Sequence, residues 1–256
     1  MSRGGEAMLR AADVEAIERA TLQAVAPEVV ESLPGWLLPM DHGTVGRARS
    51  AVPLHHDPHD THVLSTIVAR YADLGFEPRL RLPDLPAFQP WHEALAQRGW
   101  RREQPTLTLT GDVQRLLTPP DGAPADLDQT PDAAWMAMFL GEGLDPVDGA
   151  SRSRSLGRAS GTLFASVREQ GQTVACGAAS FSHGWLGVHG MRTAASRRGQ
   201  GLAGRVLHAM AAEAARRGLA GVFLQVDASN LSALALYRRV GLTLAWPYAY
   251  WRPSAA

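Results

Sequence analysis

The sequence predicts an α/β protein in which a mixed, mostly antiparallel sheet carries helices on both faces. Three runs of strand-forming residues lie between 162 and 193 and are separated only by short turns, as in an antiparallel meander. A glycine-rich loop follows, and apolar residues then recur every four positions from Leu202 to Ala214, which indicates an amphipathic helix. A buried strand, a second helix and an aromatic strand complete the order, so the elements alternate as they do in a mixed sheet.

The chain divides at residues 117–126, a segment dense in Pro, Gly, Asp and Ala. We therefore expect two domains, at residues 1–116 and 127–256, which we call the N-terminal and C-terminal halves. In the N-terminal half we expect helices at residues 12–29, 61–74 and 90–98, and strands at residues 35–40, 44–54, 78–82 and 100–110. Glycines stand directly after the second and third of these helices, where a helix commonly ends.

The C-terminal half has the more regular pattern. Pro131 and Asp132 open its first helix, because proline is tolerated in a first turn and aspartate caps it. The remaining elements are expected as a helix at residues 147–156, strands at 162–168, 173–181 and 185–193, a helix at 202–218, a strand at 221–226, a helix from 230 or 232 to Gly241, and a strand at 242–251.

Composition excludes several classes of partner. The 25 basic residues, all of them arginine, balance 25 acidic ones, so no net field attracts nucleic acid or an anionic membrane. Cys176 is the single cysteine and lies in an apolar run, which favours packing over a nucleophilic role. No stretch has the length of apolar residues that a membrane helix needs. We expect a soluble, cytoplasmic protein without nucleic-acid or membrane partners, and the sequence leaves a homodimer open.

Residues 198–203 read Arg-Gly-Gln-Gly-Leu-Ala and lie between a strand and the amphipathic helix. Glycines there allow positive φ and a close approach of the backbone to a ligand. The amides at the start of the helix, with the helix dipole behind them, form a site for a pyrophosphate. No Gly-Lys-Ser/Thr follows, which excludes a Walker loop, and the dinucleotide pattern GxGxxG is absent. A turn that serves only packing is the alternative for this loop taken alone.

A second motif follows the next expected strand and lies at the start of the next expected helix. Residues 230–242 resemble the N-x-x-A-x-x-L-Y-x-x-x-G-F signature of the GNAT N-acetyltransferases. The loop resembles that family's R/Q-x-x-G-x-G/A pattern, with Arg198, Gly201 and Ala203 at the specified positions. Residues 191–198 resemble the strand end that leads into this loop, although Ala195 replaces the usual Pro. The resemblance covers the C-terminal half.

The N-terminal half resembles a smaller, degenerate GNAT-like domain without a phosphate loop. Trp91 and His92 stand near the positions of Leu and Tyr in the family's second motif. The resemblance implies that this half has a role in packing, covers the acceptor cleft or makes contacts with partners. As a whole the chain is similar to tandem GNAT proteins.

The resemblance implies acetyl-CoA as co-substrate and no metal. The pantetheine arm would pair with the strand backbone at residues 191–193, and the pyrophosphate would meet the amides of residues 198–203. Asn230 would contact the pantetheine or the phosphate region. The residues assigned to acetyl-CoA in this way are Met191, Arg192, Thr193, Arg197, Arg198, Gly199, Gln200, Gly201, Leu202, Ala203, Asn230 and Ala233.

The resemblance also implies catalytic roles. Tyr237 would be the general acid that protonates the departing thiolate; its structural alternative is a core aromatic. His189 stands where the family often has a Glu base, and an imidazole with its ordinary pKa near 6.5 is able to accept the ammonium proton directly or through water. A histidine that fills space in the strand is the alternative. The residues expected to line the acceptor cleft, each with core packing as its alternative, are Trp135, Phe139, Glu142 and Tyr248.

The sequence thus predicts an N-acetyltransferase that moves an acetyl group from acetyl-CoA to a primary amine by direct attack in a ternary complex. A catalytically silent acyl-CoA-binding regulatory protein is the alternative. A third hypothesis is a metal-binding module at residues 55–62, which contain four histidines but no arrangement that fixes a metal geometry. Nothing in the sequence identifies the acceptor amine, because acceptor clefts are built from variable loops.

Overall fold

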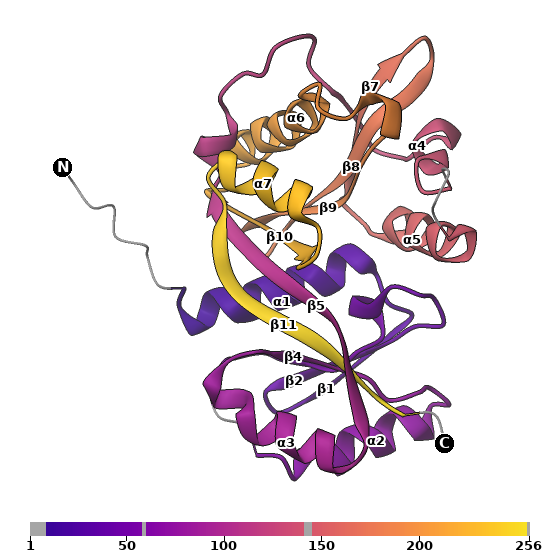
Figure 1. The fold of residues 1–256 in the computed structure, drawn as a ribbon, viewed down its shortest axis with the longest axis vertical. Coiled ribbons are helices and arrows are strands. Elements are labelled where there is room, and N and C mark those ends of the chain that lie inside the picture. The colour runs from indigo at the N-terminus through magenta and orange to yellow at the C-terminus, as the bar shows by residue number, and fades with distance from the viewer. Residues whose placement is uncertain (1–8, 58–59, 141–144, 255–256) are drawn as a thin grey trace, which may run out of the picture.

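The computed structural model describes residues 9–57, 60–140 and 145–254. They form an eight-stranded sheet in the order β4-β11-β5-β10-β9-β8-β7-β6 and a separate three-stranded sheet, β1-β2-β3 (Figure 1). In the large sheet β9 and β10 run parallel, and the other neighbouring strands are antiparallel. The predicted mixed, mostly antiparallel sheet with helices on both faces is therefore confirmed.

The described helices are α1 (Ala11–Val25), α2 (Val63–Asp73), α3 (Gln89–Gln97), α4 (Ala133–Ala137), α5 (Pro146–Arg158), α6 (Leu202–Arg216) and α7 (Leu231–Arg239). The described strands are β1 (Val29–Leu33), β2 (Trp36–Met40), β3 (Val52–Pro53), β4 (Leu80–Pro83), β5 (Trp100–Asp112), β6 (Asp126–Asp128), β7 (Leu163–Glu169), β8 (Gln172–Ser182), β9 (Trp185–Thr193), β10 (Gly221–Asp227) and β11 (Thr243–Pro253). No helix of the described residues is long and apolar enough to cross a membrane.

The two halves exchange strands within the large sheet. β5 comes from the N-terminal half but lies between β10 and β11, with Leu109 opposite both Leu224 and Leu244. β11 comes from the C-terminal half and pairs on its other side with β4. Figure 1 shows β5 and β11 side by side through the middle of the molecule, from the part that holds α6 and α7 to the part that holds α2 and α3. Residues 117–126 therefore separate two stretches of chain that share one sheet.

Two expected elements of the N-terminal half differ from the sequence-based prediction. The helix expected at residues 12–29 ends at Val25, because Ala26 takes a left-handed conformation (φ 42°) and Pro27 cannot continue the hydrogen-bond ladder. The strand expected at residues 44–54 is mostly a turn around Gly46–Ala48, and only Val52–Pro53 forms β3. Side chains hold this turn, since the Ser50 hydroxyl donates to the Gly46 carbonyl at 2.7 Å.

The sheet of the C-terminal half is covered on both faces. On one face α6 packs Val206, Leu207 and Met210 on alternate side chains of the central strands, including Val188 and Leu224. The neighbouring side chains in the strands point to the other face. There α4 and α5 cover Phe164, Cys176 and Ala178, and α1 packs its apolar side on Phe223. We call these the α6 face and the α1/α5 face.

Candidate active site

The strands β9 and β10 separate part of the way along their length. They pair in parallel from Gly221 opposite Trp185 to Leu224 opposite Val188, and no further. Beyond that point Gln225–Asp227 pair only with β5, and residues 189–193 pair only with β8. From His189 onward the edge of β9 that faces β10 therefore offers its backbone to an added extended chain.

A bulge in β9 lies where the strands separate. Cys176 pairs with Arg192 and Ala178 with His189, so β9 contains one more residue than β8 between these two pairs. Gly190 takes φ 60° there, and a Cβ on it would lie 2.9 Å from a methyl group of Leu156. Only glycine therefore fits. Bulges re-aim backbone groups and are frequent beside active sites.

The glycine loop opens α6 at the same end of β9. Gly199 (φ 77°) and Gly201 (φ 75°) take conformations that L side chains rarely adopt, and Gly201 is the residue that precedes the first turn of α6. Within the described part of the chain, the amides of residues 199–203 donate to no acceptor. Unpaired amides at a helix start, with the dipole behind them, bind anions such as a pyrophosphate.

Gly204 gives a test of whether this loop is shaped for a ligand. It lies within α6, where glycine costs about 1 kcal/mol relative to alanine. Its φ is ordinary and no atom lies within 4 Å of the position of an added Cβ, so the fold itself does not require glycine. A missing side chain beside unpaired amides is what close contact with a phosphate would require, so the loop residues fit the pyrophosphate of a CoA ester.

The two arginines of the loop differ in their contacts. Arg197 is half-buried and forms an ion pair with Glu169 on β7. Arg198 is exposed and forms no ion pair within the described residues. Only Arg198 is thus free to meet a phosphate without first releasing a carboxylate.

Asn230 caps α7. Its side-chain oxygen accepts hydrogen bonds from the Ala233 amide at 3.2 Å and from the Ser232 hydroxyl at 3.1 Å. The cap uses the oxygen only, so the side-chain NH₂ of this exposed residue is left to donate elsewhere. Asn230 therefore combines a structural role with one free donor.

Tyr237 packs in the core on the α6 face and is 6% exposed. Burial raises its pKa to about 12, so the phenol is protonated at every working pH. A hydrogen-bond partner for its hydroxyl is not found within the described residues.

The matching helix of the N-terminal half lacks this phenol. α3 and α7 are each followed by a glycine with positive φ, Gly99 and Gly241. Leu95 precedes Gly99 by the same number of residues as Tyr237 precedes Gly241, so Leu95 holds the position of Tyr237. Trp91 and His92 therefore lie about one turn before the Leu and Tyr positions near which the sequence analysis placed them.

His189 lies on the α1/α5 face and is 3% exposed. Its Nε2 is 3.0 Å from the Ser180 hydroxyl, and its ring packs edge-on against Phe223. Burial, and secondly the charge of Arg47, lower its pKa to about 3. The imidazole is therefore neutral and is a much weaker base than an exposed histidine.

The side chains expected to line the acceptor cleft are mostly interior. Trp135 and Phe139 are each 1% exposed, and the Trp135 indole donates to the Ala165 carbonyl at 3.1 Å. Tyr248 is equally buried and lies under the Arg81 guanidinium, 5.2 Å from the ring centre. Phe139 does approach the bulge, because its ring is near Gly190. Glu142 lies outside the described residues.

The histidine cluster at residues 55–62 is only partly described, since His59 lies outside the described residues. His56 packs edge-on against Trp246, with ring centres 4.9 Å apart, and His55 lies 3.6 Å from Asp57. Among the residues that the structure describes, no three His, Cys, Asp or Glu side chains converge as metal ligands.

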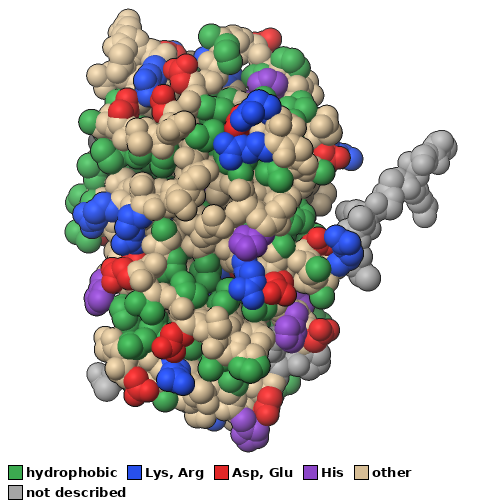
Figure 2. All heavy atoms as spheres, turned by 180° about the vertical axis from the view of Figure 1, so that it is seen from behind, with side chains coloured by type: hydrophobic (Ala, Val, Ile, Leu, Met, Phe, Trp, Pro, Cys, Tyr) green, Lys and Arg blue, Asp and Glu red, His purple; other side chains and the backbone are tan. Residues whose placement is uncertain are grey.

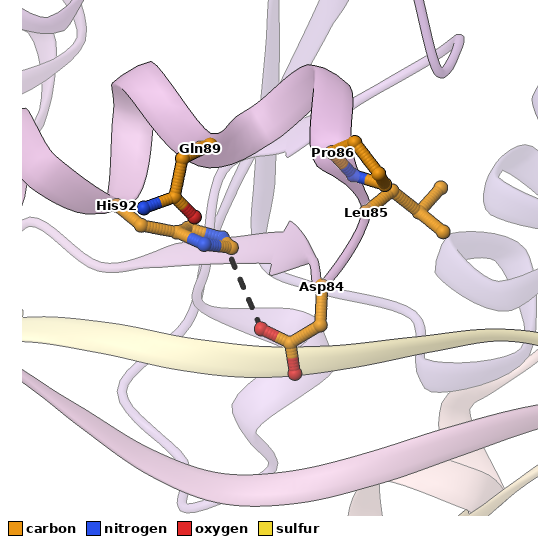
Figure 3. A pocket seen from close by; sticks show the side chains of 5 residues that line it. All are labelled: Asp84, Leu85, Pro86, Gln89 and His92. Atoms are coloured by element: carbon orange, nitrogen blue, oxygen red, sulfur yellow. Dashed lines mark ion pairs between the residues drawn. The ribbon is translucent and has the colours of Figure 1, made fainter.

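A hollow of about 700 Å³ lies in the N-terminal half, beside α3 (Figure 3). Asp84 and His92 face each other across it, with Nε2 3.9 Å from Oδ1. The Asp84 carboxylate is already paired with Arg102. We favour the β9–α6 region as the site, because its amides are unpaired whereas the charge in this hollow is compensated.

Two functional candidates escaped the sequence analysis. Arg47 acts on His189 across the boundary between the halves, and no local pattern signals such a contact. Gly190 had a usable signal, because an isolated glycine within a strand pattern suggests a bulge.

On the face shown in Figure 2, acidic and basic side chains alternate with hydrophobic ones, and no patch of a single charge stands out.

Comparisons with known proteins show the family and the fold. A sequence model of the family described as "Probable histone acetyltransferase Rv0428c C-terminal" matches residues 11–251. The probable histone acetyltransferase Rv0428c of Mycobacterium tuberculosis is 32% identical over 237 residues, which are 90% of this chain and 71% of the relative.

Solved structures share the fold at low identity. A GCN5-related N-acetyltransferase from Kribbella flavida superposes with a TM-score of 0.69 at 18% identity, over 95% of this chain and 96% of its own. A tandem GNAT protein from the clavulanic acid biosynthesis pathway gives 0.57 at 14% identity, over 96% of this chain and 98% of its own.

Proposed function

The chain belongs to the GNAT family of acetyltransferases, and on this premise we propose that it is an acetyl-CoA-dependent N-acetyltransferase. The family model that it matches is the one described as "Probable histone acetyltransferase Rv0428c C-terminal". It transfers the acetyl group to a primary amine by direct attack in a ternary complex. The observation that carries the proposal is the separation of β9 from β10 after Val188 and Leu224, at the end of β9 that leads into the glycine loop.

When bound, acetyl-CoA supplies the acetyl group as a thioester. The backbone of Met191 and Thr193 pairs with the pantetheine arm, and the free amides of residues 199–203 hold the pyrophosphate. A bond forms between the amine nitrogen and the acetyl carbon while the carbon–sulfur bond breaks with its electron pair on sulfur. One proton leaves the nitrogen and one is delivered to sulfur, so the products are an N-acetyl amine and a free thiol.

In this proposal Tyr237 donates a hydrogen bond to the developing thiolate. With a pKa of about 12 the phenol stays protonated, but it is a weaker acid than a thiol, whose ordinary pKa is about 8.5. Hydrogen bonding in the transition state is therefore the larger part of its effect, and positioning supplies the rest. Tyr237 lies on α7, the helix that Asn230 caps, and packing in the core fixes its ring.

His189 remains the proposed acceptor of the amine proton, but only for an amine that is already neutral when it binds. With a pKa of about 3 the imidazole does not hold a proton in the free protein. The amine must therefore arrive neutral and pass its proton to His189, or to a water beside it, only as the new bond forms.

The proposal is tested by the release of CoA thiol from acetyl-CoA with a panel of amines, followed by mass spectrometry of the products. The panel includes lysine peptides from histone tails, since a histone acceptor is what the name of the relative suggests. The protein's own thiol gives little background, because Cys176 is buried and burial raises its pKa to about 12. Turnover that falls in Tyr237→Phe supports the proposal. Binding of acetyl-CoA without turnover of any amine would favour the silent regulatory protein instead.

A further inference from the structure

We propose that the amine acceptor carries a carboxylate close to its amine and that the Arg192 side chain binds this carboxylate. The inference rests on the proposed function and names the chemical class of its acceptor. It concerns the side chain of Arg192, which the proposed acetyl-CoA contacts do not use, since within β9 these contacts involve only the backbone.

Beside the bulge, α6 covers one face of the sheet. On the α6 face, the side chains of Val188 and Met191 are packed against α6. The acceptor must therefore reach the end of the bulge from the α1/α5 face. Arg192 is on that face, because its guanidinium lies over the Phe139 ring at 5.3 Å from the centre. It is one residue beyond the bulge at Gly190 and Met191, beside the place where the thioester end of the ligand lies in the proposed function.

Arg192 is a half-buried cation that forms no ion pair with the residues that the structure describes. Its Nε atom has no exposed surface and no hydrogen-bond partner, and its guanidinium forms no ion pair with the described residues. An arginine stays charged in a protein. Leaving such a charge desolvated and unpaired is costly, so buried charges are normally paired or serve a ligand.

The carboxylate whose charge acts on Arg192 is Asp148, but the two side chains form no ion pair in the described structure. Asp148 on α5 accepts from Arg152 at 2.6 Å and from the Thr44 hydroxyl at 2.7 Å. Although burial opposes ionisation, these two hydrogen bonds hold the pKa of Asp148 below its ordinary value, so its charge is already in use. Burial, and secondly the positive charges of Arg152 and Arg198, lower the pKa of Arg192, and the charge of Asp148 opposes this only in part.

A second unpaired arginine comes from the N-terminal half. The loop that carries Arg47 is anchored on α5, since the Thr44 amide donates to the Ser151 hydroxyl at 2.8 Å. The Nε of Arg47 is also buried without a partner, and its charge acts on His189. The α1/α5 face thus carries two arginines, Arg47 and Arg192, that form no ion pair within the described residues.

These charges decide between classes of acceptor. A cationic peptide, such as a lysine-rich tail, would meet like charges at Arg47 and Arg192. A carboxylate matches the planar fork of one guanidinium with two parallel hydrogen bonds and a single charge. A phosphate carries more charge than the Arg192 guanidinium alone compensates. We therefore choose a carboxylate, as in an amino acid or the amino-terminal residue of a short acidic peptide.

The first test compares matched acceptors that differ only in this group. Amino acids and their carboxamides are assayed with acetyl-CoA at equal concentrations of neutral amine. For the wild type we expect kcat/KM to favour the acid by roughly 10- to 100-fold. The preference should fall below about twofold in Arg192→Met, chiefly through KM, and partly return in Arg192→Lys. Arg70→Met removes one charge from an exposed site on α2 and should keep the full preference.

The second test needs no turnover. Because Met keeps the contact with Phe139 and removes the unpaired charge, Arg192→Met should melt about 2–4 °C above the wild type. Malonate, added to the acetyl-CoA complex as a carboxylate probe, should raise the melting temperature of the wild type but not of Arg192→Met. Inorganic phosphate at equal ionic strength serves as the second probe.

The outcomes separate the inference from the proposed function. Failure of acetyl-CoA itself to shift the melting temperature counts against the proposed function. If acetyl-CoA binds, three results overturn the carboxylate assignment: acids and amides used equally well, a malonate shift that survives in Arg192→Met, or a shift with phosphate alone. A fall in the melting temperature of Arg192→Met would show that the guanidinium serves the fold.

Discussion

Glu18 and Arg81 form a buried ion pair with two hydrogen bonds that ties α1 to β4. Both side chains are at most 2% exposed, and Nη1 donates to Oε1 at 3.1 Å. The same guanidinium lies over Tyr248 on β11, while Thr21 of α1 accepts a hydrogen bond from Gln225, the first residue of β10 beyond its pairing with β9. The pair thus fixes the helix that spans the exchanged strands and covers His189.

Breaking this pair from one side should strongly destabilise the protein. Glu18→Gln leaves the Arg81 charge buried and unpaired, so we expect the free energy of unfolding to fall by about 3–5 kcal/mol. Urea unfolding of Glu18→Gln, Arg81→Met and the double variant Glu18→Met with Arg81→Met measures this. The double variant should recover much of the loss. A loss under about 1 kcal/mol in both single variants would contradict the burial of the pair.

Tyr237→Phe should lower kcat by about 10- to 1,000-fold and change KM for acetyl-CoA little, because the hydroxyl acts on the developing thiolate. Its melting temperature should stay close to that of the wild type, since the ring and its packing remain. Because burial raises the pKa of Tyr237 to about 12, the phenol should keep its proton, and kcat should show no loss from its ionisation below pH 10. Unchanged turnover in Tyr237→Phe would remove this role.

His189 should make the protein less stable in acid. Its pKa is about 3 when folded and near 6.5 when unfolded, so between these values the unfolded chain binds the extra proton. Its contribution to stability is present above pH 6.5 and is lost as the pH falls, by roughly 1.4 kcal/mol per pH unit. Urea unfolding at pH 7 and pH 5 should show a smaller acid loss for His189→Gln than for the wild type. Equal losses would mean that the imidazole is solvated.

The same histidine predicts the pH dependence of the rate. Because the imidazole is neutral from pH 4 upward, kcat/KM should rise with pH through the pKa of the acceptor amine and show no step between pH 6 and 7. Acceptors of different amine pKa measure this, since the rise should move with the acceptor. A step near pH 6.5 that disappears in His189→Gln would instead identify a solvated imidazole base in the working enzyme.

Gly204→Ala should separate stability from binding. Alanine in the first turn of α6 should raise the free energy of unfolding by up to about 1 kcal/mol, because glycine is the poorer helix former. KM for acetyl-CoA should nevertheless rise severalfold, because the methyl group occupies the space left for the phosphates. Gly157→Ala is the matched control on α5, where an added Cβ meets only ordinary contact with Pro131. An unchanged KM in Gly204→Ala would count against phosphate contact at this turn.

Asn230→Asp should divide the two functions of this side chain. Aspartate keeps an oxygen that caps α7, so stability should be retained, whereas Asn230→Ala should lose about 1 kcal/mol of the free energy of unfolding. Aspartate also removes the NH₂ donor and adds a charge, so KM for acetyl-CoA should rise in both variants. Thermal melts and steady-state kinetics distinguish these effects. A wild-type KM in Asn230→Asp would leave Asn230 with the cap alone.

Local features of the site were predictable because they depend on local sequence. The positive φ of Gly199 and Gly201 and the unpaired amides of the helix start follow from a glycine pattern ahead of an amphipathic stripe. The cap at Asn230 follows in the same way from a polar residue ahead of a helix. These features require no knowledge of what packs around them.

The environments of the charged and aromatic side chains were not predictable, because residues distant in the chain create them. Trp135 and Phe139 looked equally suited to a cleft or a core, and only the structure shows that both are buried and pack with Phe164 of β7. The weak basicity of His189 arises from burial under elements of both halves and from the charge of Arg47. Desolvation depends on all neighbours at once, and a sequence pattern contains only the nearest of them.

The sequence by itself therefore determined the order of elements, the glycine loop, the capped helix and the family they resemble, because backbone conformation and periodicity are local. Only the tertiary structure decided that β5 inserts between β10 and β11, since strand partners are chosen by packing across long distances in the chain. It also decided that Glu18 pairs with Arg81, while Arg192 forms no ion pair within the described part of the chain. That difference, which no local pattern contains, is what points to the charge of the acceptor.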